Sequence, residues 1–168
     1  MEEPQHSLDL EEHLRVQRLG WVVSRTAWIA MAAIVVAALL GFFGGGPLGR
    51  RSIEHASGVV LHYDGFGRYG ADSILRFEVP ASAAGGTERS VWLDTDYVQS
   101  MKVDNISPEP DTVTQSEGGY LYTFLASDRA SVLEVTFDLT AGAVGQTQGA
   151  FSDGTADQIS TFHQFISP

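Results

Sequence analysis

Residues 133–139 read Leu-Glu-Val-Thr-Phe-Asp-Leu, so apolar and polar side chains alternate along the whole segment. Successive side chains of a β-strand point to opposite faces of a sheet, and strict alternation is typical of a strand with one buried face. Residues 75–79, Leu-Arg-Phe-Glu-Val, repeat this pattern. The two segments predict strands of a half-buried sheet.

The same two-residue period extends over the chain from residue 57 onward. Val59, Leu61 and Tyr63 share one face of a further strand. Breaks rich in Gly, Pro, Asp and Ser separate the other expected strands, which are residues 90–93, 98–104, 120–125, 143–148 and 159–166. About seven to nine short strands without a convincing helix predict an all-β fold, an immunoglobulin-like β-sandwich. A small closed barrel is the alternative.

An uncharged segment of 24 residues separates Arg25 from Arg50 and is most apolar over residues 27–43. About 20 apolar residues, at roughly 1.5 Å of rise per residue, cross a hydrocarbon core of about 30 Å. A buried helix of a globular domain is normally shorter and has amphipathic neighbours. The segment therefore predicts one N-terminal transmembrane helix.

A cleaved signal peptide is the alternative interpretation, because a basic region before an apolar one describes both kinds of segment. The apolar stretch exceeds the usual length for a signal peptide, 25 residues precede it, and no Ala-x-Ala site follows it. These features favour an uncleaved signal anchor. Three arginines precede the segment (Arg15, Arg18 and Arg25) and two follow it, so the positive-inside rule predicts a cytoplasmic N-terminus.

The chain is accordingly expected to divide into four parts. Residues 1–25 form a cytoplasmic tail, in which a helix begins near Ser7 and runs into the membrane. Residues 26–43 form the transmembrane helix, and residues 44–56 form a linker that starts with Gly-Gly-Gly-Pro. Residues 57–168 form the extracytoplasmic β-sandwich domain of a protein of the inner (cytoplasmic) membrane.

Charge and cysteine content exclude several classes of function. The formal net charge is −11, and residues 55–168 carry 15 Asp and Glu against 5 Lys and Arg. Such a surface repels nucleic acid, whose binding requires cationic contacts to phosphate. The absence of cysteine excludes disulfides, thiolate nucleophiles and sulfur-ligated zinc or copper.

Three short segments of the chain resemble a known family. They are Arg-Val-Gln-Arg-Leu-Gly-Trp at 15–21, Leu-Leu-Gly-Phe-Phe-Gly-Gly-Gly-Pro-Leu at 39–48 and Phe-His-Gln-Phe-Ile-Ser-Pro at 162–168. They are similar to a family of uncharacterised bacterial single-pass membrane proteins with an extracytoplasmic β domain. The resemblance implies a bacterial envelope protein and assigns no activity or functional residue.

Acidic side chains in one expected loop are candidate ligands for a cation. Asp94 and Asp96, with Asp104 and Asn105 nearby in sequence, offer the oxygen ligands that Ca²⁺ prefers. The segment lacks the spaced Asp, Gly and Glu residues of a known calcium loop, and a solvated acidic turn is the alternative interpretation. No cofactor is predicted.

The histidines and aromatic residues of the β domain are expected to serve the fold and not catalysis or metal binding. His55, His62 and His163 lie outside any sequence context of a catalytic triad or a zinc site, so no catalytic residue and no enzyme are predicted. Trp92 is expected to point away from the face that its neighbours share. The stripe formed by Tyr120, Tyr122 and Phe124 fits a core face, with sugar or partner binding as the alternative.

Small residues recur every four positions in the transmembrane segment. Ala33, Ala37 and Gly41 form a ridge on which a second helix packs closely in lipid. We therefore expect a non-enzymatic envelope protein, an accessory or interaction subunit with a membrane-protein partner or self-association in the bilayer. A tethered module that binds cell-wall glycan or a cation is the alternative.

Overall fold

The computed structural model describes residues 6–39, 49–81, 86–154 and 158–168 of the chain. The chain divides into two compact units, Met1–Phe42 and Phe43–Pro168, which are described separately below.

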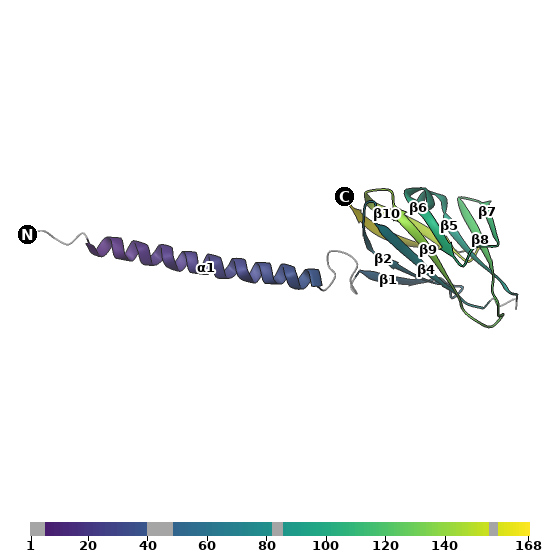
Figure 1. Ribbon diagram of the computed structural model, residues 1–168, viewed down its shortest axis with the longest axis horizontal. Helices are drawn as coiled ribbons and strands as arrows, with labels where there is room; N and C mark the ends of the chain where they lie inside the picture. Colours follow the sequence, from purple (N-terminus) through teal and green to yellow (C-terminus); the bar gives the residue numbers. More distant parts are fainter. Residues whose placement is uncertain (1–5, 40–48, 82–85, 155–157) are drawn as a thin grey trace, which may run out of the picture. The chain divides into compact units, whose positions relative to one another are not determined.

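The first unit contains one helix, α1 (His6–Leu39), of 34 residues (Figure 1). The helix begins at His6, within the predicted tail and next to Ser7, where a helix was predicted to begin. It continues through the predicted transmembrane segment as far as Leu39. Residues 40–43 of that segment lie outside the described residues. The portion Gly20–Leu39 has a mean hydropathy of 2.0 and is long and apolar enough to cross a membrane. Its large apolar side chains are exposed, with Trp28 67% and Leu39 79% accessible.

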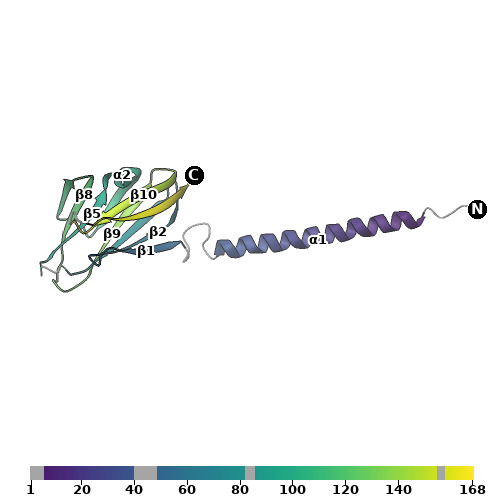
Figure 2. The same cartoon turned by 180° about the vertical axis from the view of Figure 1, so that it is seen from behind.

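The second unit is mostly β and forms two sheets, which agrees with the predicted sandwich and not with a single closed barrel. The order of strands in the five-stranded sheet is β1-β2-β4-β9-β6, and in the six-stranded sheet it is β3-β11-β10-β5-β8-β7 (Figures 1 and 2). The elements are β1 (Arg50–Glu54), β2 (Val60–Asp64), β3 (Phe66–Arg68), β4 (Asp72–Val79), β5 (Glu88–Asp94), α2 (Thr95–Ser100), β6 (Met101–Ser107), β7 (Thr112–Ser116), β8 (Gly119–Leu125), β9 (Leu133–Ala141), β10 (Gly145–Ser152) and β11 (Ser160–Ser167).

The two segments with the clearest alternation pair with each other at the centre of the five-stranded sheet. β4 and β9 are antiparallel, with Leu75 opposite Phe137 and Phe77 opposite Val135. All four side chains are fully buried. Phe77 also meets Phe151 of the other sheet at a ring-centroid distance of 5.6 Å, so the two sheets share one core.

Two glycines allow close packing, Gly149 within this core and Gly119 beneath the outward-facing Trp92. A Cβ atom at Gly149 of β10 would overlap the rings of Phe162 and Tyr97, which fill that space instead. A Cβ atom at Gly119 of β8 would overlap the indole of Trp92. Trp92 is half-buried while Val91 and Leu93 are buried, so its predicted orientation is confirmed.

Three sequence-based expectations are wrong in the described residues. The predicted linker, residues 44–56, contains β1 from Arg50 onward, because pairing with β2 makes this segment an edge strand. The strand predicted over 98–104 begins at Met101, because α2 occupies residues 95–100 and leads the chain from the six-stranded to the five-stranded sheet. The structure describes eleven strands, more than the seven to nine that were predicted. β1, β3 and β7 were not predicted, because they lack a clear apolar alternation.

Candidate functional site

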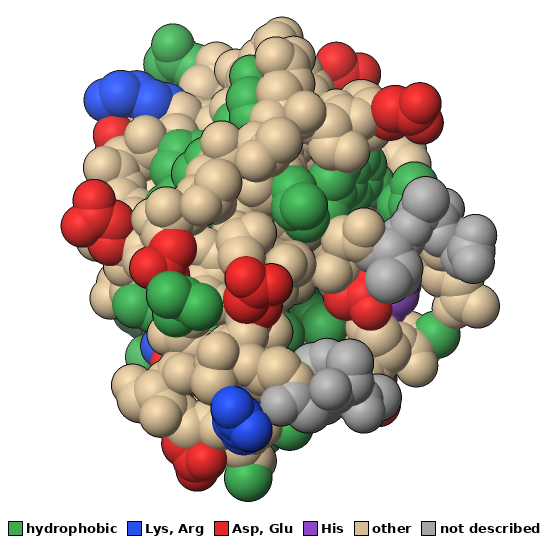
Figure 3. All heavy atoms as spheres, turned by 90° about the vertical axis from the view of Figure 1, so that its right-hand side faces the viewer, with side chains coloured by type: hydrophobic (Ala, Val, Ile, Leu, Met, Phe, Trp, Pro, Cys, Tyr) green, Lys and Arg blue, Asp and Glu red, His purple; other side chains and the backbone are tan. Residues whose placement is uncertain are grey.

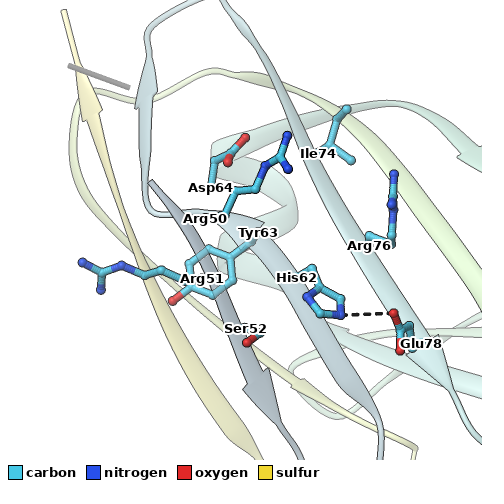
Figure 4. Close-up of a pocket in the computed structure, with 9 residues that line it drawn as sticks. All are labelled: Arg50, Arg51, Ser52, His62, Tyr63, Asp64, Ile74, Arg76 and Glu78. Carbon is cyan, nitrogen blue, oxygen red and sulfur yellow. Dashed lines mark ion pairs between the residues drawn. The ribbon is translucent and has the colours of Figure 1, made fainter. Parts of the chain in front are cut away.

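The outer face of the five-stranded sheet carries a polar depression of about 410 Å³. It lies over β1, β2 and β4 (Figure 4). The residues that line it are Arg50, Arg51, Ser52, His62, Tyr63, Asp64, Ile74, Arg76 and Glu78. This site leaves no signal in the sequence, because its members come from three segments and no two of them form a recognisable motif.

Strand register brings these side chains together in rows across the sheet. Ser52 is opposite His62, and His62 is opposite Arg76. Residues directly opposite each other in an antiparallel pair have side chains on the same face, about 4.5–5.5 Å apart at Cβ. Arg50 and Asp64 form a second such pair. The register therefore places both donor and acceptor side chains over the depression.

Two ion pairs cross this face, and both are open to solvent. Nε2 of His62 lies 3.2 Å from Oε1 of Glu78, and the two side chains are 44% and 47% exposed. Nε of Arg76 lies 3.1 Å from Oε1 of Glu134 on β9. Solvent-exposed ion pairs contribute about 0–1 kcal/mol to stability. The charged groups are thus able to exchange these partners for a ligand at little energetic cost.

The depression suits a polar ligand that offers both an anionic group and hydroxyl groups. Guanidinium groups bind carboxylate and phosphate as paired donors, and carboxylates accept hydrogen bonds from hydroxyl groups. Ile74, 45% exposed, supplies the apolar contact within the depression (Figure 4). The described part of the domain holds seven Lys and Arg, and two of them, Arg50 and Arg76, extend over this site, whereas the Arg51 side chain points away from it (Figure 4).

The candidate cation ligands are not brought into one cluster. Asp94 ends β5 in the six-stranded sheet, and Asp96 is exposed in the first turn of α2. Asp104 lies on β6 of the other sheet, where it pairs with Lys102 at 2.8 Å and accepts a hydrogen bond from Thr140. Among the described residues, no group of three His, Cys, Asp or Glu side chains is arranged to hold a metal ion.

The pKa values of the Asp104–Lys102 pair reflect this contact. Hydrogen bonds donated by Lys102 and by Thr140 lower the pKa of the Asp104 carboxyl. The bond to Asp104 in turn raises the pKa of the Lys102 ammonium group. The Asp104 carboxylate is therefore already bonded to Lys102 and Thr140, and it lies on the surface strand β6 and not in a loop that could bind a cation.

The three histidines of the domain lie in separate environments. His55 is buried, with Nδ1 2.8 Å from Oγ of Ser57 and Nε2 3.0 Å from the carbonyl oxygen of Gln158. His163 is exposed on β11. His62 faces outward in the depression, as the alternation predicted. The structure does not bring the three rings together.

A buried polar network joins four elements, α2, β2, β4 and β11. The Tyr97 hydroxyl donates to Oε1 of Gln164 at 2.6 Å. Nε2 of Gln164 donates to the carbonyl oxygen of Asp64 at 2.7 Å and to Oγ of Ser73 at 3.4 Å. Burial, with a smaller effect from Tyr63, raises the pKa of the Tyr97 hydroxyl well above its ordinary value. These groups satisfy each other and serve the fold.

Arg89 is a buried cation at the other end of the sandwich. Its Nη1 donates to the carbonyl oxygens of Gly86 (2.8 Å) and Glu88 (3.0 Å), and its Nη2 to that of Arg129 (2.9 Å). The side chain is 2% exposed, and its Nε has no hydrogen-bond partner among the described residues. Arg89 thus ties the connection before β5 to the one between β8 and β9.

The predicted aromatic stripe is a core feature. Tyr122 and Phe124 are buried, and Tyr120 packs against the core. Of the predicted ridge, Ala33 and Ala37 lie four residues apart in α1, and Gly41 lies outside the described residues. Packing of a second helix on this ridge stays a prediction.

Comparisons with known proteins place the chain in no family. No family model matches it, and no curated protein matches it. A solved structure, the cohesin module from Clostridium perfringens ATCC13124 family 33 glycoside hydrolase, is similar over 65% of this chain and 95% of that module. The sequence identity is 12% and the TM-score is 0.41, which is too low for any inference about function.

Proposed function

We propose that this chain is a membrane-anchored, non-enzymatic envelope protein, an accessory or interaction subunit. In this proposal, α1 crosses the inner membrane and the β domain lies on the extracytoplasmic side. We keep the immunoglobulin-like build as part of the proposal, since two sheets with one shared core are its basic arrangement.

The observation that carries the proposal is the exposed apolar surface of α1. Trp28, Ile29 and Ile34 are 67%, 64% and 59% exposed, and the first unit contains no other described element that packs against them. Soluble monomers rarely expose contiguous apolar patches larger than a few hundred Å². A bilayer removes such a surface from water, and Gly20–Leu39 has the length to span it.

The polar groups of the β domain support a binding role rather than a catalytic one. The buried groups Tyr97, Gln164 and His55 are hydrogen-bonded within the fold. The ion pairs on the outer face are half-exposed, so water reaches both of them. Catalytic groups depend on a preorganised, water-excluded site, whereas recognition of a partner requires only an accessible surface.

Cysteine labelling tests the topology, because the chain contains no cysteine of its own. Ser7→Cys and Thr161→Cys are introduced singly, and cells with a permeabilised outer layer are treated with a membrane-impermeant maleimide. We expect labelling at position 161 and none at position 7 until the inner membrane is broken. The reverse pattern would invert the topology, and recovery of the chain in the soluble fraction would refute the anchor.

The depression on the five-stranded sheet favours a second candidate function, binding of an acidic cell-wall glycan. Calorimetric titration of residues 49–168 with uronic acid oligomers tests it. Arg50→Gln and Arg76→Gln should weaken a saturable signal, and Arg68→Gln, an exposed arginine on β3, is the matched control. Equal binding by all three variants would exclude this site.

A further inference from the structure

The edges of the two sheets differ in their protection against pairing with another chain. An edge strand exposes unpaired N–H and C=O groups, and proteins guard it with charges, bulges or short length. Of the two edges of the five-stranded sheet, β1 carries Arg50, Arg51 and Glu54. The other edge, β6, has a register shift between Val103 and Asn105 and carries a charged pair. Both edges are protected.

The two edges of the six-stranded sheet are unequal. One edge, β3, has three residues and ends with Arg68. The other edge, β7, reads Thr-Val-Thr-Gln-Ser over Thr112–Ser116 and carries no charge, proline or bulge within the strand. Three of its five residues are β-branched and favour extended pairing. Among the described edge strands, β7 is the one whose own residues carry no protective feature, although Pro110 and Asp111 precede it and Glu117 follows it.

β7 is also accessible on both faces. All five residues are exposed, including Val113 at 49%. Figure 3 views the molecule from the side on which Figure 1 labels β7, and it shows a mostly uncharged surface with scattered acidic groups and a few basic ones. No described strand pairs with the free side of β7, so this side can accept an added strand.

We propose that β7 pairs antiparallel with β7 of a second copy of this chain in the same membrane, about a two-fold axis at Thr114. This places Val113 opposite Gln115 and Thr112 opposite Ser116 of the second copy, so no like charges face each other. Two six-stranded sheets become continuous across the axis. The inference rests on the proposed membrane anchor.

A second copy fits this edge better than a foreign peptide. Strand addition takes its affinity from main-chain hydrogen bonds and its specificity from pockets for alternate side chains. Both faces of β7 are exposed, and the described depression lies on the other sheet. The edge has little means to select a foreign sequence, whereas two-fold symmetry makes it complementary to itself.

The small size of the contact explains why the membrane matters. Five residues per copy fall short of the roughly 800 Å² per partner of a stable interface. Copies anchored in one bilayer meet at a high effective concentration without any further contact. The pairing is therefore expected between anchored chains and not in dilute solution.

The test is disulfide trapping in full-length chain reconstituted in lipid vesicles. Residues directly opposite each other in antiparallel strands have Cα atoms about 4.5–5.5 Å apart, within the range of a disulfide. Thr114→Cys should form a covalent dimer with mild oxidant. The matched control is Thr161→Cys, exposed on β11 inside the same sheet.

A second pair of variants separates the edge from general charge effects. On the Thr114→Cys background, Val113→Lys with Gln115→Lys should slow trapping by about tenfold or more. Gln146→Lys with Gln148→Lys, exposed on the interior strand β10, adds the same charge and should not. Circular dichroism melting of all variants verifies that each one folds.

The outcomes distinguish the two proposals. Equal trapping at positions 114 and 161, or none at 114 in chain that has inserted, would overturn the edge pairing and leave the anchor standing. Failure of the chain to insert into vesicles would overturn both proposals. Trapping of position 114 to a different polypeptide in native membranes would replace the second copy by a foreign partner.

Discussion

Gly149 shows how a single missing side chain shapes the core. The rings of Phe162 and Tyr97 occupy the space where a Cβ atom would lie, at a ring-centroid distance of 4.8 Å from each other. We expect Gly149→Ala to lower the free energy of unfolding by about 1–3 kcal/mol, because a tightly packed core resists added atoms. Urea unfolding measures the change.

Gly86→Ala is the matched control for this substitution. The nearest atom to a Cβ there is the Glu88 nitrogen, 3.9 Å away, so the methyl group meets no crowding. A loss as large as that of Gly149→Ala would show that the effect comes from backbone freedom and not from packing.

Tyr97 links stability to alkaline pH. Burial raises the pKa of its hydroxyl, so the neutral form is favoured in the folded state. Its contribution is fully present below the pKa of an unfolded tyrosine, about 10, and is lost as pH rises above that value. Tyr97→Phe should cost about 1–2 kcal/mol at pH 8, where Gln164 loses its donor.

The stability difference between wild type and Tyr97→Phe should therefore shrink between pH 8 and about pH 11, as followed by urea midpoints. Burial also raises the pKa of Tyr122, but that residue is the same in both proteins. A difference that stays constant with pH would mean that the Tyr97 hydroxyl is not the group responsible.

Outward-facing residues were predictable at this scale, and buried polar ones were not. The alternation alone orients His62 and Trp92. Gln164 forms a hydrogen bond to Asp64, 100 residues away in the sequence, and His55 forms one to Gln158, 103 residues away. A local sequence pattern cannot predict partners at such a separation. The depression was missed for the same reason, because register assembles it from three strands.

β1 is the element that the sequence hides most completely. Its sequence, Arg-Arg-Ser-Ile-Glu, has one apolar residue and no alternation, so it was assigned to the linker. Pairing with β2 and the packing of Ile53 against the core make it a strand. The strongly alternating β4 and β9, by contrast, were predicted because both of their faces have a fixed environment.

Removal of β1 tests whether this edge stabilises the domain. We expect residues 49–168 to melt at least about 5 °C above residues 57–168, because the shorter fragment loses β1 and the buried His55. Thermal circular dichroism measures both. Equal melting temperatures would mean that β1 lies on the sandwich without adding to its stability.

The β domain as a whole is expected to fold without a metal ion or a disulfide. The aromatic core joins both sheets through the Phe77–Phe151 and Tyr122–Phe137 pairs. Residues 49–168 should melt in one cooperative transition that is unchanged by chelator or reductant. A lower melting temperature with chelator would reveal a structural cation, and Asp94 and Asp96 would again be candidate ligands for it.

Division of the chain was the most predictable feature at this scale. A bilayer requires a long uncharged segment, and a sandwich requires alternation, so the order of apolar and polar residues along the chain separates the two units. Strand edges were not predictable, because β7 becomes an edge only through the order of six strands. Its five polar and small residues resemble any exposed loop until that order is known.

The three tryptophans are distributed so that each unit carries its own fluorophore. Trp21 and Trp28 lie on α1, and Trp92 is the single tryptophan of the sandwich, where it covers Gly119 next to the turn of the β7–β8 hairpin. Emission from residues 49–168 therefore originates at one position beside that hairpin. In the full chain, with α1 in the bilayer as proposed, a lipid-soluble quencher would act on Trp21 and Trp28 only. Their emission would then report on the bilayer, and the emission of Trp92 would report on the strand edge.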